Sequence, residues 1–136
     1  LKQAADLHSN RLSQWLVLQQ LESAERPARM ARLVDFYRHK RDLFAAALQR
    51  HFGALASWET PAGGLFFWVR LHEPTDTRAL LSEAIAAGVA FMPGEAFYPD
   101  DPAATGTLRL NFSHANEADI DRGLATLADL CARRMG

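Results

Sequence analysis

The segment Thr107-Leu108-Arg109-Leu110-Asn111-Phe112-Ser113 alternates between apolar and polar residues over most of its length. Such strict alternation indicates a β-strand with one buried face, because successive side chains point to opposite sides of a sheet. We therefore expect the guanidinium of Arg109 to be fixed on a rigid strand, facing away from the core. Its planar fork of donors suits a carboxylate or phosphate, which it can bind through two parallel hydrogen bonds. The strand alone also fits a surface arginine that only solvates the sheet.

The composition is that of one ordinary globular domain over residues 1–136, with 49% hydrophobic and 23% charged residues. The net charge of -1 gives no electrostatic reason to expect nucleic acid or a membrane as a partner. The single cysteine, Cys131, excludes an internal disulfide and fits a reducing compartment, so we expect a cytoplasmic protein. The chain begins without methionine and in mid-element, which suggests a piece of something longer.

Periodicity and capping residues predict four helices and four strands. Together they predict an α/β (α+β) fold, in which a small mixed sheet of three or four strands has helices packed on one face. The first helix is expected to be capped by Ser9 or Asn10 and to run to about 23, the second to span 27–51, the third to be capped by Thr75 or Asp76 and to end at 88, and the last to be capped near Asn116. The strands are expected over 57–59, 65–71, 89–92 and 107–113.

Two stretches suggest a missing neighbour or a functional role. The strand over 65–71 is apolar on both faces, because Phe66 and Trp68 lie opposite an all-apolar side, so a second domain or subunit is expected to cover it. Residues 93–106 hold three of the six prolines and two of the eight glycines. A loop of this length exceeds a simple connection and is typical of functional segments.

Several common site motifs are missing from the sequence. The five histidines are scattered without the spacing of metal ligands, so no metal site is expected. No glycine-rich phosphate loop precedes a helix, and no nucleophile–base motif is present. The polar cluster of Asp6, His8, Ser9 and Asn10 is interpreted as a helix cap and turn.

The order and spacing of four motifs resemble those of class I/II aminotransferases, over nearly the whole chain. Within this family the sequence is most similar to the branch of 2-aminoadipate and aromatic aminotransferases, which includes MocR-like regulators. Lys40 departs from the family pattern, which has arginine at this position. The similar segments are W-E-T-P-A-G-G-L-F-F-W-V at 58–69, G-V-A-F-M-P-G-E-A-F-Y at 88–98, L-R-L-N-F-S at 108–113, and the group formed by D-L-H-S at 6–9 with Tyr37 and Arg41-Asp42.

The resemblance implies that the chain is the C-terminal small domain of a pyridoxal 5'-phosphate (PLP) enzyme of fold type I, with residues 1–22 as a connecting helix from a missing large domain. It implies that Arg109 binds the substrate α-carboxylate and that Phe97 lines the substrate pocket. The full-length protein would transfer an amino group between an amino acid and a 2-oxo acid, as a homodimer with composite sites.

The resemblance assigns no catalytic or cofactor-binding residue to this chain. The family's Schiff-base lysine lies in the large domain, and neither Lys2 nor Lys40 matches its position. We therefore predict that the 136-residue piece alone is inactive and does not hold PLP covalently.

Two other functions remain open from the sequence. The chain could be the effector domain of a MocR-type (GntR-type) transcription regulator, whose DNA-binding part lies upstream. It could also be a non-catalytic α+β module that binds an acidic ligand through Arg109. What precedes the chain in the full reading frame distinguishes these alternatives.

Overall fold

The computed structural model describes residues 10–100 and 105–135, and it divides into two compact units, Leu1–Phe36 and Tyr37–Gly136. In the first unit, helix α2 spans Arg11–Glu22 and helix α3, Arg26–Phe52, begins. Asn10 caps α2, since its Oδ1 accepts hydrogen bonds from the amides of Leu12 and Ser13. The other candidate cap, Ser9, and the polar residues Asp6 and His8 lie outside the described residues.

Many large apolar side chains of this first unit are exposed. In α2 no described residue is buried. Such a surface normally packs against something else. The side chains with exposed fractions between 46% and 64% are Leu12, Trp15, Leu16, Val17, Leu18, Leu21, Met30, Leu33, Val34 and Phe36.

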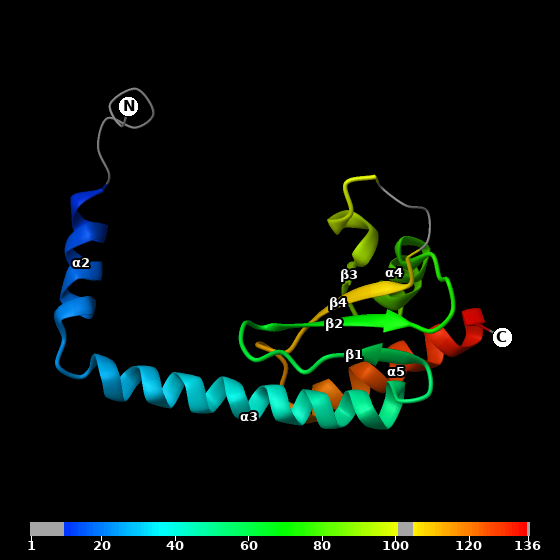
Figure 1. Ribbon diagram of the computed structural model, residues 1–136, viewed down its shortest axis with the longest axis horizontal. Helices are drawn as coiled ribbons and strands as arrows, with labels where there is room; N and C mark the ends of the chain where they lie inside the picture. Colours follow the sequence, from blue (N-terminus) through cyan, green and yellow to red (C-terminus); the bar gives the residue numbers. More distant parts are fainter. Residues whose placement is uncertain (1–9, 101–104, 136) are drawn as a thin grey trace. The chain divides into compact units, whose positions relative to one another are not determined.

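The second unit is built on a four-stranded sheet, shown in Figure 1. Its strands are β1 (Ala56–Trp58), β2 (Phe66–Leu71), β3 (Met92–Pro93) and β4 (Thr107–Asn111), in the order β1-β2-β4-β3. All three pairings are antiparallel, whereas the sequence had suggested a mixed sheet. Strand β4 therefore has a neighbour on each side.

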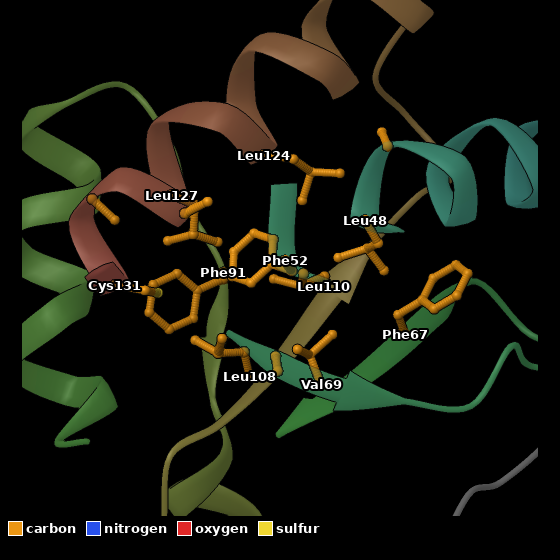
Figure 2. Close-up of a cluster of buried hydrophobic side chains, with 14 of the residues drawn as sticks. Leu48, Phe52, Phe67, Val69, Phe91, Leu108, Leu110, Leu124, Leu127 and Cys131 are labelled. Carbon is orange, nitrogen blue, oxygen red and sulfur yellow. The ribbon is translucent and has the colours of Figure 1, made fainter. Parts of the chain in front are cut away.

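The hydrophobic core lies between this sheet and the helices on one of its faces. Helix α5 (Glu117–Met135) and the C-terminal part of α3 cover that face, and α4 (Thr77–Ala86) contributes at one end. Figure 2 shows side chains of β2 and β4 pointing toward those of α3 and α5. The rings of Phe44 and Phe67 stack at 5.2 Å, and Phe112 meets Phe67 edge-on at 5.7 Å.

The predicted alternation of β2 and β4 is confirmed. Phe67, Val69 and Leu108 are fully buried, while Phe66 is 41% exposed on the opposite face. Strand β4 ends at Asn111. The Oδ1 of Asn111 accepts hydrogen bonds from the amide and the hydroxyl of Ser113, and this local turn replaces the strand conformation.

The strand expected over 89–92 is much shorter than predicted. Gly88 has a φ of +82°, and the Val89 amide still donates to the Ala84 carbonyl, so this segment completes the C-terminal turn of α4. Pairing with β4 begins only at Met92 and ends at Pro93, which has no amide hydrogen to extend it.

Side chains cap the last two helices as the sequence predicts. Asp76 caps α4 through the amides of Arg78 and Ala79, and Asn116 Oδ1 accepts from the Asp119 amide at the start of α5, so both predicted caps are confirmed.

No helix within the described part of the chain is long and apolar enough to cross a membrane.

Candidate functional site

Arg109 lies on the face of the sheet opposite the core, near the middle of β4. It is directly paired with Trp68 of β2 on one side and Met92 of β3 on the other. Its guanidinium carbon is 4.3 Å from the centroid of the Phe66 ring and 4.6 Å from that of the Phe97 ring. Both distances are within the range of cation–π attraction, so the two rings hold the cation in place.

A third aromatic ring, that of Trp68 in β2, lies beside Phe97. Phe97 meets Trp68 edge-on with a centroid distance of 5.5 Å. Phe66, Trp68, Met92 and Phe97 each retain an exposed fraction between 37% and 45%. The guanidinium is therefore set in an apolar surface that remains open on its outer side.

The charge of Arg109 has no acidic partner in this part of the chain. Within residues 10–100 and 105–135, no carboxylate forms a salt bridge with Arg109. Its Nε is buried and has no hydrogen-bond partner among the described residues. A cation in apolar surroundings without a counter-charge favours binding of an anion, and the terminal nitrogens have the planar geometry that suits a carboxylate.

Phe97 reaches Arg109 from a short 3-10 helix, η1 (Gly94–Phe97), which follows β3. This helix packs against the start of β4. A β-carbon on Gly94 would lie 2.8 Å from the carbonyl oxygen of Thr107 and would overlap its Oγ1, so only glycine fits there. The contact explains why Thr107 is fully buried although it shares a strand face with Arg109.

The chain that follows β4 is attached to α3 by Lys40. The Nζ of Lys40 donates hydrogen bonds to the carbonyl oxygens of Ser113, His114 and Ala115, at 2.9, 3.3 and 3.1 Å. An ammonium group has three donor hydrogens, which matches these three acceptors. The departure at position 40 therefore has a structural role at the end of the strand that carries Arg109.

The structure brings the two predicted site residues, Arg109 and Phe97, into contact. The sequence did not reveal that Phe66 is the second ring at the guanidinium. The available signal was its position on the strand face opposite the all-apolar one. That Phe66 pairs with Asn111, two residues from Arg109 on the same face, becomes known only with the register.

The described residues contain little that could attach a metal or a cofactor. Among them there is no group of three or more metal-binding side chains. Lys40 directs its Nζ to backbone carbonyls, and Lys2 lies outside the described residues. In the part of the chain that the structure describes, the guanidinium of Arg109 is thus a donor group that suits a carboxylate.

The sheet has helices on one face and, on the other, an arginine between two aromatic rings that has no acidic partner in the described part of the chain, an arrangement that suits an anionic group. The profile of the family described as "Aminotransferase class I and II" matches residues 1–127, and the chain belongs to this family.

Relatives and solved structures agree with this assignment. The chain is 34% identical over 134 residues to "Aromatic-amino-acid aminotransferase 1" of Thermococcus litoralis, covering 98% of this chain and 32% of the relative. It is 33% identical over 128 residues to "2-aminoadipate transaminase" of Thermus thermophilus, covering 93% and 31%. The structure of Pyrococcus horikoshii kynurenine aminotransferase "in complex with PMP, KYN as substrates and KYA as products" superimposes with a TM-score of 0.91 at 32% identity, covering 99% of this chain and 33% of that one.

A regulator is also among the relatives. The chain is 27% identical over 135 residues to "Uncharacterized HTH-type transcriptional regulator YisV" of Bacillus subtilis, covering 99% of this chain and 27% of that protein. The chain thus spans about a third or less of the length of the relatives it matches.

Proposed function

We propose that the chain is the C-terminal small domain of a PLP-dependent aminotransferase, and that Arg109 binds the α-carboxylate of the amino acid and 2-oxo acid substrates. One observation carries the proposal: the guanidinium lies at 4.3 and 4.6 Å from two aromatic rings on the open face of the sheet, with no acidic partner among residues 10–100 and 105–135. The family assignment supplies the reaction class.

The role of Arg109 in this proposal is to bind and orient. A bidentate pair between the guanidinium and the carboxylate fixes the direction of the substrate, so that the same Cα–H bond is presented in every turnover. The exposed apolar surface of Phe66, Trp68 and Phe97 keeps water from part of the pair, which strengthens the electrostatic attraction. When bound, PLP supplies the electron sink for breaking that bond.

Phe97 is proposed to line the substrate pocket beside the carboxylate. It is 45% exposed while it contacts both Arg109 and Trp68, so one part of its ring is free to meet a ligand. Because this ring touches the guanidinium itself, it would lie beside the substrate's Cα and not at the far end of its side chain.

The cofactor is proposed to be held by residues outside this chain. We expect the isolated 136-residue chain, mixed with PLP, to show no stable visible absorption band after gel filtration, because no described lysine is placed to attach it. A band that persists through gel filtration would contradict this. The related kynurenine aminotransferase is in complex with PMP, the amino form of PLP, which supports use of the same cofactor by the whole protein.

The exposed apolar side chains of this chain support a proposal about its binding partners. The outer face of β2 and the apolar side chains of α2 and the start of α3 are proposed to pack against an N-terminal large domain and a second subunit, in a cytoplasmic homodimer. Light scattering of the full-length protein tests the dimer: a mass of two chains is expected, and a monomer at micromolar concentration would contradict it.

The central experiment measures discrimination between an amino acid and the amine that lacks its carboxylate. In the full-length protein, Arg109→Gln is expected to lower the ratio of kcat/KM for the amino acid to kcat/KM for the amine by about 100-fold or more. The reason is that the charged partner of the carboxylate is lost. The control is Arg70→Gln, since Arg70 is exposed on the same face of the neighbouring strand. An unchanged ratio in Arg109→Gln would refute the proposal.

The regulator relative favours a second candidate function, the effector domain of a transcription regulator. The same carboxylate site would then sense an amino acid and not turn it over. Cloning the full reading frame and measuring DNA binding with and without amino acids distinguishes the two. A DNA-binding segment upstream together with amino-acid-dependent binding would support the regulator.

A further inference from the structure

Glu95 is a fully buried carboxylate that the proposed function does not use. Its side chain has an exposed fraction of 0% and lies in η1, between Gly94 and Ala96. Burial of an acid is costly unless hydrogen bonds replace the lost water. Glu95 has three such bonds: from the amide and the hydroxyl of Thr77, and from the amide of Thr105.

These donors come from two different elements. Thr77 is the first residue of α4, where backbone amides have no partner within the helix and the helix dipole favours negative charge. Thr105 lies two residues before β4. Burial raises the pKa of Glu95, but the hydrogen bonds from Thr77 and Thr105 outweigh it and the pKa is lowered overall, so the side chain is ionised at neutral pH.

The buried carboxylate therefore fixes η1 from one side. Gly94, immediately before it, packs on Thr107 at the start of β4. Phe97, two residues after it, contacts Arg109. The short helix has only four residues, so a shift of Glu95 must move the Phe97 ring as well.

We propose that Glu95 is a positioning residue for the carboxylate site: by binding the start of α4 and the segment before β4, it sets the place of the Phe97 ring and, through that ring, of the Arg109 guanidinium. The inference rests on the proposed function of Arg109. It adds a residue that never touches the substrate and that determines how well the substrate is aligned.

The test uses the full-length protein and three variants of this network. Glu95→Gln keeps the shape and loses the charge. Thr77→Val removes the hydroxyl donor and keeps the amide, and Thr77→Ser restores the hydroxyl. The matched control is Glu83→Gln, because Glu83 also lies on α4 and also binds a partner, Arg134, but belongs to the exposed surface.

Glu95→Gln and Thr77→Val are expected to raise KM for the amino acid and to lower the amino acid to amine ratio of kcat/KM by about two- to fivefold, because they act through the Phe97 ring and its cation–π contact with Arg109. Thr77→Ser is expected to return both values to near wild type, and Glu83→Gln to leave them unchanged. If Glu95 only stabilises the fold, Glu95→Gln will lower Tm and leave the amino acid to amine ratio of kcat/KM unchanged.

The outcomes separate this inference from the proposed function. If Arg109→Gln loses discrimination while Glu95→Gln and Thr77→Val retain it, the positioning role is refuted and the carboxylate site stands. If Arg109→Gln itself retains discrimination, the proposed function is refuted. Should Glu95→Gln fail to fold, Thr77→Val and Thr77→Ser decide the positioning role.

Discussion

Gly94 and Thr107 are packed so closely that the glycine has no room for a β-carbon. The added atom would lie 2.8 Å from the Thr107 carbonyl oxygen and would overlap the Thr107 hydroxyl. Through this contact η1 lies against the strand of Arg109, and Phe97 is brought to the guanidinium. The aromatic surroundings of Arg109 thus depend on a backbone contact two residues away from it in β4.

We expect Gly94→Ala to lower the stability of the second unit by about 1–3 kcal/mol, because the new methyl group forces η1 away from β4. The measurement is Tm of the full-length protein by calorimetry. Gly63→Ala is the control, since a β-carbon there meets nothing within 4 Å. Equal Tm values for the two variants would show that the close contact can relax without cost.

Phe97→Leu is expected to raise KM for the amino acid about two- to fivefold with little change in kcat. The substitution removes a ring 4.6 Å from the guanidinium, and a cation–π contact of this kind contributes about 0.5–1 kcal/mol. Phe97→Tyr retains the ring and is expected to keep the wild-type KM. KM is measured for both variants by steady-state kinetics. If Phe97→Leu and the wild type have the same KM for the amino acid, the Phe97 ring makes no contribution to substrate binding.

Lys40→Met should lower stability by about 1–3 kcal/mol, because three carbonyl oxygens lose a charged donor at once. Lys40→Arg should recover part of the loss, because a guanidinium can still reach some of the carbonyls. Arg32→Met, an exposed position in the same helix, serves as the control. The Tm of all three variants is measured by thermal denaturation. If Arg32→Met and Lys40→Met lower Tm equally, the hydrogen bonds from Lys40 to the three carbonyls do not contribute to stability.

The thiol of Cys131 is expected to react slowly with iodoacetamide in the folded protein at pH 7.5. Burial raises its pKa to about 11, so almost none of the reactive thiolate is present, and the side chain is fully enclosed. Alkylation followed by mass spectrometry should proceed at the rate of unfolding and become fast in denaturant. Rapid labelling without denaturant would indicate that the end of α5 opens readily.

Glu95 should make stability depend on pH in the acid range. Because its pKa is lowered in the folded state, the ionised form contributes stability that is present above the unfolded pKa of about 4.3 and is lost as pH falls through the folded pKa. We expect Tm to fall less steeply below pH 5 in Glu95→Gln than in wild type. Parallel pH profiles for the two proteins would show that Glu95 does not titrate on unfolding.

The elements with strong local signals were predictable from the sequence. The alternation around Arg109 can be read from a single segment. The cap residues Asp76 and Asn116 form hydrogen bonds with amides only two or three positions further along the chain. These features depend on hydrogen bonds and side-chain directions that neighbouring residues determine. The resemblance to the aminotransferases added the choice of ligand, which the strand by itself left open.

Most of the features that were missed depend on contacts between distant segments, and the length of β3 is a local exception. The rings at the guanidinium come from residues 66 and 97, and Lys40 bonds to carbonyls more than 70 positions away. Strand β3 was predicted too long because the helical turn at Val89 continues beyond Gly88. Glu95 had no visible partner in the sequence, since its donors lie 18 and 10 residues away on different sides.

The two outermost strands of the sheet, β1 and β3, have only three and two residues, and β3 ends in a proline. Such short borders offer a foreign chain almost no backbone groups to pair with, which protects the sheet from growing by strand addition. Within the described part of the chain, the edges of this sheet therefore give fibrillar aggregation little template, and association through the sheet is expected to use side chains that pack on its surface.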